Sequence, residues 1–469
     1  MHYDVVIVGG GITGLTAAYR LTKDAPHLKV ALIEASGRLG GKLHTDRVGG
    51  FLLEGGADSF LSRKAGGLRL CRELGIDGEL IGRLELPHQK SNRAWVKRHG
   101  KFHPLPEGLT GLIPTNLDAL KTTTLLSDEG KARIAEEPNQ PAGDFSADQS
   151  VGDFITSRLG REAYENIVEP LMSGIYAADG DQLSILSTFP QLRSVVQKHG
   201  SLIGGLSGAM PPPNPDALPP FVSFVDGIGY LITKLIEQID AVEIHINTSV
   251  KSIGRLASGK WQVASEQLEL TSDRLIVTTP AHVNAKLLED VDMNLAQAMG
   301  DIPFAGTVLV NVGLNANDLD LPEGYGYVIP KVEQRNVLAC TWTSEKWPER
   351  APDGKKSVRV YIGRHGEDDV CAMDDHTLIE MARQELIQTL GLPDNAKQMF
   401  VVHRWPKGLA QYNLGHQEVL GTIDNAVANL PGFAIAGASY RGVGIPDCID
   451  SAEAAVKKIF NLPKNQSGF

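Results

Sequence analysis

Cysteine is scarce in this chain of 469 residues, and its four cysteines stand far apart. Cys71, Cys340, Cys371 and Cys448 form no CxxC pair and share no metal-ligand spacing with histidine. Zinc sites and redox dithiols need closely spaced thiols, and disulfide frameworks need more of them. We therefore expect no bound metal, no dithiol redox centre and no disulfide-stabilised fold.

Long apolar runs and clusters of one charge are also missing. No window approaches the roughly 20 apolar residues of a membrane-spanning helix. No basic and apolar leader precedes the first expected strand. The formal charge is −11, and no run of Lys or Arg is long enough to follow a phosphate backbone. We expect a cytoplasmic protein, at most attached to a membrane surface, that does not bind nucleic acid.

The remaining composition is that of a globular protein, with 42% apolar and 22% charged residues. Near the N-terminus the pattern predicts a strand at Tyr3–Val8, a helix from Ile12 to Leu21 and a strand at Lys29–Glu34. The chain closes with an expected strand at Phe433–Ala438 and a helix at Ile445–Phe460. Because both ends have the form of dinucleotide-fold pieces, we expect a discontinuous cofactor domain.

The middle of the chain changes character twice. Residues 105–206 read as helical segments with polar breaks, Val151–Glu169 among them, which predicts a separate helical lobe. Alternating apolar residues over Thr307–Ile362 predict a second sheet. The proline-rich stretch Met210–Pro220 predicts an extended connection, since proline removes a backbone donor. Gly204–Gly208 follows no strand and is interpreted as a loop.

Three glycines near the N-terminus follow the pattern of a nucleotide-binding turn. Gly9, Gly11 and Gly14 match GxGxxG between an expected strand and an expected helix, and Glu34 stands 20 residues after Gly14. Such glycines let the backbone approach a pyrophosphate at the helix N-terminus, while the acid accepts hydrogen bonds from a ribose. A coincidental glycine turn would lack this context.

Three further glycine-rich segments help to distinguish between FAD and NAD as the bound dinucleotide. Gly40-Gly41-Lys42, Glu54–Ser59 and Gly442–Asp447 each allow another close approach to a ligand, although edge hairpins or a surface helix would look similar. Several backbone segments that each approach the ligand closely imply a long ligand, which favours FAD over NAD. With one nucleotide fingerprint and no dithiol, we expect an oxidase or desaturase that passes electrons to dioxygen or another acceptor.

These motifs resemble those of the flavin-dependent protoporphyrinogen/coproporphyrinogen oxidases of haem synthesis, most closely the coproporphyrinogen III oxidases of Gram-positive bacteria. The resemblance covers nearly the whole chain. It is carried by IVGGGITGL (7–15), EASGRLGGK (34–42), DSFLSRK (58–64), EPLMSGIYAAD (169–179), CTWTSEKWPERAPDGK (340–355), RWPKGLAQYNLGH (404–416) and GASYRGVGIPDCIDSAEAAV (437–456). Amine oxidases, carotenoid desaturases and the non-redox Rab GDP-dissociation inhibitors are the alternatives on the same scaffold.

The resemblance implies an α/β (α+β) fold of the p-hydroxybenzoate hydroxylase type. Its discontinuous, Rossmann-like FAD-binding domain would comprise residues 1–64, 224–290 and 403–469. A sheet-based substrate-binding domain would comprise 65–104, 207–223 and 291–402, and the helical lobe 105–206 would be a region for membrane association. FAD is expected to be non-covalent.

The cofactor contacts implied by the resemblance form one set along the expected FAD path. The pyrophosphate, ribose and flavin contacts would be Gly9, Gly10, Gly11, Ile12, Thr13, Gly14, Glu34, Ala35, Lys42, Gly56, Ala57, Asp58, Ser59, Val250, Trp405, Ile445, Pro446 and Asp447.

The implied reaction is oxidation of coproporphyrinogen III to coproporphyrin III in three hydride steps, with O2 as acceptor and H2O2 as product. Protoporphyrinogen IX is the alternative substrate. Lys64 is expected to bind substrate carboxylates and Tyr361 and Tyr176 to line the cavity, although a solvated lysine and core tyrosines would read the same. Expected partners are the porphyrinogen, O2, a peripheral membrane contact and a transient contact with a downstream chelatase. The isolated His403 is given no catalytic role.

Overall fold

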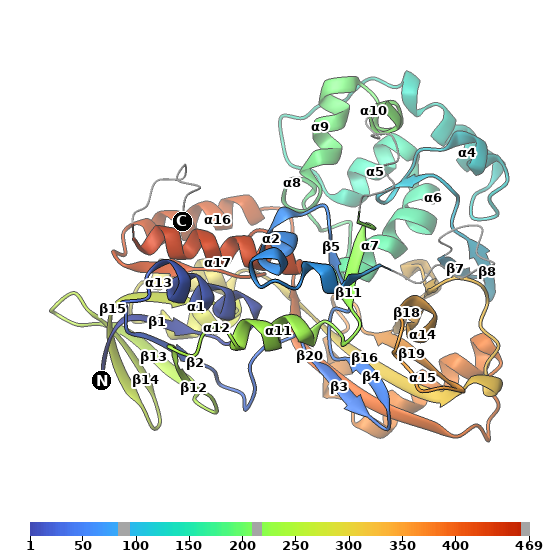
Figure 1. Ribbon diagram of the computed structural model, residues 1–469. Helices are drawn as coiled ribbons and strands as arrows, with labels where there is room; N and C mark the ends of the chain where they lie inside the picture. The colour runs from blue at the N-terminus through green and yellow to red at the C-terminus, as the bar shows by residue number, and fades with distance from the viewer. Residues whose placement is uncertain (83–93, 209–217, 461–469) are drawn as a thin grey trace.

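A seven-stranded sheet is assembled from three distant stretches of the chain, on the left of Figure 1. The computed structural model describes residues 1–82, 94–208 and 218–460. The strand order is β12-β2-β1-β15-β14-β13, and β21 also pairs with β15. These strands are β1 (His2–Val8), β2 (Val30–Ile33), β12 (Glu243–His245), β13 (Val250–Arg255), β14 (Trp261–Ser265), β15 (Glu269–Val277) and β21 (Phe433–Ile435).

β1 lies at the centre of this sheet, parallel to both of its neighbours. Val5 pairs with Val30 on β2 and with Arg274 on β15. Val5 and Ile7 face one hydrophobic cluster, while Val6 and Val8 face another. A strand buried on both faces reads as a continuous apolar run, as the sequence of β1 does.

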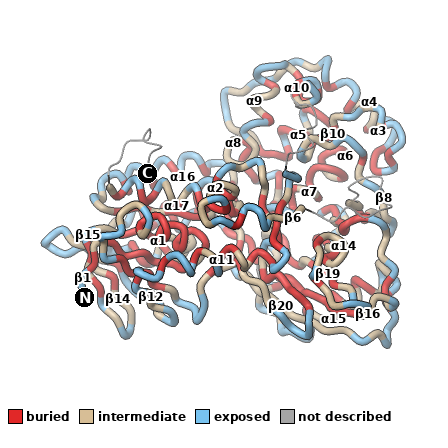
Figure 2. Tube along the Cα trace, viewed as in Figure 1, coloured by how far each residue is buried: buried red, intermediate tan, exposed pale blue. Residues whose placement is uncertain are grey.

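Helices cover both faces of this sheet. The first cluster contains residues of α1 (Ile12–Asp24), α2 (Ala65–Glu73), α11 (Gly229–Ile236) and α17 (Ile445–Ile459). The second contains residues of α12 (Ala281–Leu287), α13 (Met293–Gly300) and α16 (His416–Ala428). Figure 2 shows the resulting buried interior of this part in red. The α/β fold class that the sequence predicts is confirmed.

A second seven-stranded sheet lies at the lower right of Figure 1, in the order β20-β16-β19-β18-β17-β7-β8. Its strands are β7 (Trp95–Arg98), β8 (Lys101–Pro104), β16 (Phe304–Asn315), β17 (Gly326–Val328), β18 (Val337–Trp342), β19 (Lys355–Ile362) and β20 (Gln398–Ala410). Helix α15 (Asp375–Leu390) packs on it. Trp405 pairs with Thr307 and Leu409 with Ala305, so β20 bulges between these pairs, and Lys407 there has φ +53°.

Short elements complete the connections between these sheets. They are β3 (Thr45–Val48), β4 (Phe51–Glu54), β5 (Phe60–Leu61), β6 (Leu80–Ile81), β9 (Leu109–Thr110), β10 (Ile113–Pro114), β11 (Phe221–Phe224), helix α14 (Thr343–Lys346) and the 3₁₀ turns Asp77–Glu79, Glu137–Asn139, Ala316–Asp318, Lys331–Glu333 and Asp368–Ala372.

The helical lobe stands apart at the upper right of Figure 1. It contains α3 (Leu117–Lys121), α4 (Asp128–Ala135), α5 (Val151–Leu159), α6 (Arg161–Ala163), a π-helical turn (Tyr164–Val168), α7 (Glu169–Tyr176), α8 (Ile185–Thr188), α9 (Pro190–His199) and α10 (Leu202–Gly208). Gly160, at φ +90°, ends α5, so the helical segment predicted over Val151–Glu169 is broken at this residue and resumes with α6 and the π-helical turn.

The predicted loop at Gly204–Gly208 is also wrong, because these residues form the end of α10. The buried Glu137 carboxylate accepts hydrogen bonds from the N–H groups of Leu202 and Ile203, which start the helix. A Cβ at Gly205 would lie 2.5 Å from Val195, so glycine here permits close packing on α9. Residues 209–217 of the predicted extended connection lie outside the described residues.

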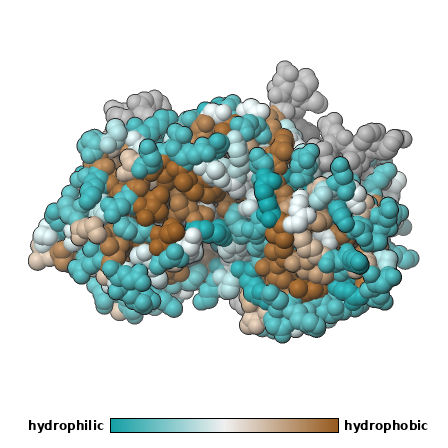
Figure 3. Space-filling view, turned by 60° about the horizontal axis from the view of Figure 1, so that its bottom comes forward, coloured by the Kyte–Doolittle hydropathy of each residue, from teal (hydrophilic) through white to brown (hydrophobic). Residues whose placement is uncertain are grey.

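Within the described ranges, we find no helix with both the length and the apolarity needed to cross a bilayer. The face in Figure 3 carries brown apolar areas interrupted by hydrophilic side chains. Scattered apolar residues on a surface are ordinary for globular proteins.

Candidate functional site

The glycine turn between β1 and α1 has the geometry that nucleotide binding needs. Gly9 has φ +106°, and a Cβ there would lie 2.6 Å from Thr278 Oγ1. A Cβ on Gly14 would lie 1.8 Å from the Gly9 carbonyl oxygen, whereas one on Gly11 would meet no atom within 4 Å. The first glycine thus shapes the turn, the third lets helix and strand approach, and the second leaves open space. Ile12 and Thr13 form the buried first turn of α1.

Glu34 stands directly beside this turn. Its carboxylate accepts hydrogen bonds from Gly10 N at 2.7 Å, from Ser36 N at 2.8 Å and from Ser36 Oγ at 2.7 Å. A carboxylate has about four acceptor positions, so it retains capacity for ribose hydroxyls. Thr248 N donates to the Glu34 carbonyl at 2.9 Å, which brings the start of β13, Val250, toward the same corner. The adjacent Ala35 is exposed.

A second glycine segment lies against the first. Gly40 N donates to Gly10 O at 2.8 Å, and a Cβ on Gly41 would lie 3.1 Å from Gly11 Cα. Only glycine permits two backbones to come this close at positive φ. The two glycine segments are separated in the sequence by α1 and β2, and the fold brings them into direct contact.

Two predicted residues meet the bulge of β20. The Lys42 ammonium group donates to the Gly408 carbonyl, and Trp405 Nε1 donates to Gly55 O at 2.7 Å. Burial lowers the pKa of Lys42. A desolvated cation at this position attracts negative charge, so it suits a flavin or phosphate neighbour.

Asp58 joins the turn after β4 to the second sheet through buried charges. Its carboxylate accepts hydrogen bonds from Lys346 Nζ at 2.8 Å and Trp347 Nε1 at 3.1 Å, and Arg359 Nη2 lies 3.2 Å away. Burial opposes ionisation, but the Lys346 and Arg359 cations outweigh it and hold the pKa of Asp58 well below its usual range. Arg359 Nη1 also donates to Gly56 O at 2.9 Å. The Asp58 side chain therefore fixes this junction, which leaves Ala57 exposed and Ser59 half-buried beside it.

The N-terminus of α17 carries an ion pair with a predicted substrate residue. Lys64 Nζ lies 2.7 Å from both carboxylate oxygens of Asp447, and Gly444 N donates to Asp447 at 3.1 Å. Ile445 and Pro446 form the first turn of this helix. The Lys64 side chain is 41% exposed. This lysine is therefore paired on one side and open to solvent on the other.

The two predicted cavity tyrosines belong to different apolar clusters, which meet where Tyr176 is followed by Ala177. Tyr361 packs against the cluster formed by Ala177, Ala305, Leu338 and Ala339. Tyr176, the chain neighbour of Ala177, is buried, and its burial raises its pKa to about 12. The cluster thus joins the end of α7 to the second sheet.

His282 is a residue that the sequence did not single out. Its ring lies edge-on to Phe304, with centroids 4.6 Å apart, and its buried Nδ1 has no hydrogen-bond partner among the described residues. Burial lowers its pKa to about 4, and Lys407 and Lys42 add to the effect. No spacing in the sequence points to this histidine, because the two lysines that lower its pKa, Lys42 and Lys407, are far from it in the chain.

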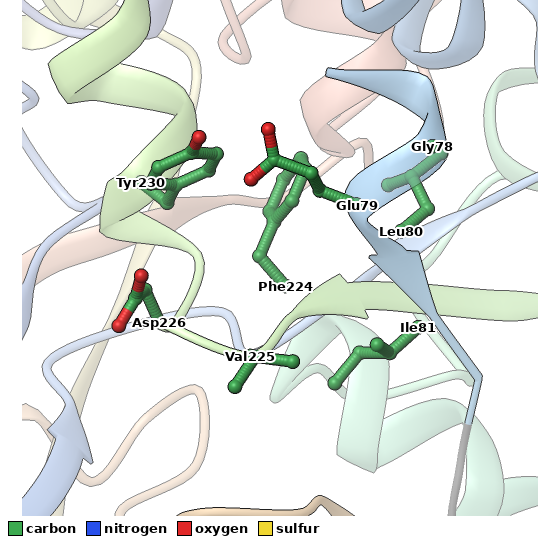
Figure 4. A pocket seen from close by; sticks show the side chains of 8 residues that line it. All are labelled: Gly78, Glu79, Leu80, Ile81, Phe224, Val225, Asp226 and Tyr230. Carbon is green, nitrogen blue, oxygen red and sulfur yellow. The ribbon is translucent and has the colours of Figure 1, made fainter.

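A surface pocket of about 270 Å³ lies elsewhere, and none of the predicted site residues lines it (Figure 4). The side chains of Tyr230, Glu79 and Asp226 and the apolar Phe224 and Val225 border it, from α11, β6 and β11 and the segments beside them. The candidate site is therefore the glycine corner and its surroundings.

These features define an α/β flavoprotein oxidoreductase with a second sheet that is antiparallel except between β17 and β7. Residues 12–460 match the family described as flavin containing amine oxidoreductase, and the chain belongs to it. The expected FAD cofactor is thereby confirmed.

Within that family the chain belongs to the porphyrinogen oxidases. It is 34% identical to a coproporphyrinogen III oxidase of Bacillus subtilis, over 96% of this chain and 97% of that protein. It is 29% identical to the protoporphyrinogen oxidase of Homo sapiens, over 99% of this chain and 100% of that protein.

Solved structures agree with this assignment. A crystal structure from Exiguobacterium sp. 255-15 that carries a protoporphyrinogen oxidase name aligns with a TM-score of 0.86 at 32% identity, over 97% of this chain and 98% of that one. A putrescine oxidase structure aligns with a TM-score of 0.68 at 16% identity, over 98% of this chain and 99% of that one, and shares the fold alone.

The glycine corner fits FAD on observations of its own. Gly11 leaves room for a pyrophosphate at the N-terminus of α1, Glu34 keeps free acceptor positions, and the ammonium group of Lys42 has no carboxylate within hydrogen-bond distance among the described residues. The individual contacts with FAD stay predictions.

We predict that Gly11→Ala separates folding from flavin binding. At φ −74° alanine is tolerated, and the lost N-terminal cap costs about 1 kcal/mol or less. The added methyl group fills the space needed by the pyrophosphate, so the purified protein should fold but carry no flavin. Gly421→Ala is the matched control, since it also meets no atom within 4 Å and lies in α16. A yellow Gly11→Ala protein would contradict this.

We also predict a pH effect from His282. In the unfolded chain its pKa is about 6.5. The folded-state pKa of about 4 means that its contribution to stability is complete above pH 6.5 and is lost as the pH falls through 4. His282→Gln should therefore lose less unfolding free energy than the wild type between about pH 7 and pH 5 in urea denaturation.

His376→Gln is the control, because it makes the same substitution at an exposed histidine, so a difference between the two variants isolates the effect of burial. Parallel pH profiles of His282→Gln and the wild type would refute the assignment.

Proposed function

We propose that the protein oxidises coproporphyrinogen III to coproporphyrin III in three two-electron steps, with O2 as acceptor and H2O2 as product. The observation that supports this choice is the full-length similarity to coproporphyrinogen III oxidases of Bacillus subtilis and Staphylococcus aureus, at 34% and 32% identity. The proposal includes protoporphyrinogen IX as a second substrate, since the protoporphyrinogen oxidase of Macaca fascicularis matches at 30% identity.

The proposed mechanism relies on positioning rather than on an acid–base triad. FAD held at the N-terminus of α1 and by Glu34 would supply a two-electron acceptor for the meso CH2 bridges of the substrate, with dioxygen as the terminal acceptor. Aromatisation drives the reaction, and pyrrole protons can leave to solvent. The apolar cluster of Ala177, Leu338 and Ala339 beside Tyr361 would hold the macrocycle and keep water away.

Lys64 is our proposed contact for substrate carboxylates. Its ammonium group is held by Asp447 at the start of α17, which restricts its position, while the side chain stays 41% exposed. A placed cation binds a carboxylate with less loss of side-chain entropy than a free one. Tyr176 and Tyr361 would line the macrocycle at either side of the apolar cluster.

We also propose the predicted division into an FAD-binding part, a substrate-binding part and a helical lobe. The two sheets and the separate lobe hydrophobic cluster support it. β20 runs from Gln398 to Ala410 in the second sheet, whereas α2 and α13 pack on the first. The proposal therefore assigns β20 to the substrate-binding part and α2 and α13 to the FAD-binding part. Non-covalent FAD, a cytoplasmic setting, a peripheral membrane contact and a transient chelatase contact complete the proposal, on the family resemblance.

The decisive experiment incubates the purified holoprotein with reduced coproporphyrinogen III and, separately, with protoporphyrinogen IX, in air and without oxygen. Porphyrin fluorescence and peroxide are followed together. We expect porphyrin and peroxide in air, at a ratio of one to three, with the higher kcat/KM for coproporphyrinogen III. No porphyrin beyond the non-enzymatic rate, or turnover of polyamines instead, would refute the function.

Lys64→Met tests the carboxylate contact within the same assay. Methionine keeps the apolar stem and removes the charge, so KM should rise with little change in kcat if Lys64 binds the substrate. Arg63→Met changes the neighbouring exposed cation and should leave KM unchanged. Equal kinetics for Lys64→Met and the wild type would remove Lys64 from the site.

A further inference from the structure

Three side chains with metal-ligating atoms meet where the β3–β4 hairpin lies beside β20 (Figure 1). His44 precedes β3, Asp46 lies in β3, and His403 lies in β20. One ligating atom from each lies within 4.8 Å of the other two. His403 Nε2 is 2.8 Å and His44 Nε2 is 3.6 Å from the same Asp46 oxygen.

We propose that His44, Asp46 and His403 bind one divalent transition-metal cation, with Zn²⁺ as the best match. Two imidazole nitrogens and one carboxylate oxygen form a donor set that zinc accepts, with water in the fourth position. Bonds of about 2.0–2.2 Å require ligand atoms roughly 3.3–3.5 Å apart. The His44–Asp46 separation of 3.6 Å is already close to this value, the His403–Asp46 separation of 2.8 Å must widen, and the two histidine ligand atoms, which lie within 4.8 Å, must approach each other where they are farther apart than this. Rotation of the side chains can supply these small changes.

The surroundings make room for this donor set. A Cβ on Gly55 would lie 1.9 Å from His44 Cε1, so the imidazole occupies the space left by the missing side chain. The rings of His44 and His403 have centroids 5.1 Å apart, and Trp405 lies edge-on to His44 at 6.1 Å. The two histidine side chains are 17% and 9% exposed, and Asp46 is 39% exposed, which gives an ion a route from solvent.

Charges of both signs surround His44. The Arg38 cation opposes a second cation, and the Asp46 carboxylate offsets it. Buried His44 Nδ1 has no hydrogen-bond partner among the described residues.

His403 would exchange a proton for the ion. Its Nδ1 faces the Asn311 amide nitrogen at 3.2 Å, so Nε2 carries the proton shared with Asp46 in the metal-free protein. Metal binding at Nε2 moves this proton to Nδ1, where the Asn311 oxygen accepts it once the amide turns. That turn gives up the 3.2 Å bond from Asn311 to the Glu54 carbonyl, so we expect moderate affinity.

The test uses the holoprotein and Zn²⁺ alone, in equilibrium dialysis with metal analysis. We expect about one Zn²⁺ per chain and at least about tenfold weaker binding in His44→Gln and His403→Gln, because each removes one of three ligands. His199→Gln changes an exposed histidine in α9 and should bind like the wild type. Visible flavin absorption and the thermal midpoint verify that each variant is folded.

Gly55→Ala provides an independent variant that keeps all three ligands. Its methyl group displaces the His44 ring, so Zn²⁺ binding should weaken although no donor is lost. Failure of the wild type to bind Zn²⁺, or affinity that is the same in His44→Gln and Gly55→Ala as in the wild type, would overturn the proposal.

Discussion

The close approach of α1 to β1 is the constraint on which the rest of the site depends. A side chain at Gly14 would overlap the Gly9 carbonyl oxygen, so glycine alone allows the helix to start directly above the strand. Because of the contact between Gly14 and Gly9, the N-terminus of α1 faces the open space beside Gly11. Glu34 and Gly40 then bind opposite sides of Gly10, through its N–H and its carbonyl. One turn thereby gathers three segments of chain around the place for a pyrophosphate.

The second sheet is held against this corner by charge as well as by packing. Asp58 binds Lys346 and Arg359 away from solvent, and Trp405 and Lys42 reach across to backbone carbonyls on the opposite side of the junction. A buried ion pair is weak evidence for stability, but loss of one partner leaves an uncompensated charge. Such contacts fix the relative position of two sheets within narrow limits, which hydride transfer between a bound cofactor and a substrate requires.

The glycine corner was predictable because its chemistry is local. Gly9, Gly11, Gly14 and Glu34 lie within one strand–helix–strand unit, and their spacing alone specifies the geometry. The helix predicted at Ile445–Phe460 forms as α17 over Ile445–Ile459 for the same reason. The family resemblance supplied the porphyrinogen oxidase assignment, which local residues could not.

Other features could not be predicted because their partners are remote in sequence. Asp58 and Lys346 are 288 positions apart, and Asp46 and His403 are 357 apart. The helix at Gly204–Gly208 depends on Glu137, a carboxylate more than 60 positions earlier, which no local propensity reveals. His282 owes its depressed pKa to burial and to lysines contributed by distant segments. In each instance tertiary contacts decided what the local pattern left open.

The account depends on a dinucleotide that lies along the glycine corner, with its adenylate half gripped by the turn and Glu34. Titration of the apoprotein with FAD and, separately, with FMN measures this most directly, because FMN lacks the adenylate half. We predict saturable FAD binding at one per chain and FMN binding at least about a hundredfold weaker, since only FAD carries the second phosphate and the adenosine ribose that the turn and Glu34 would bind. Equal affinities for FAD and FMN would contradict the account.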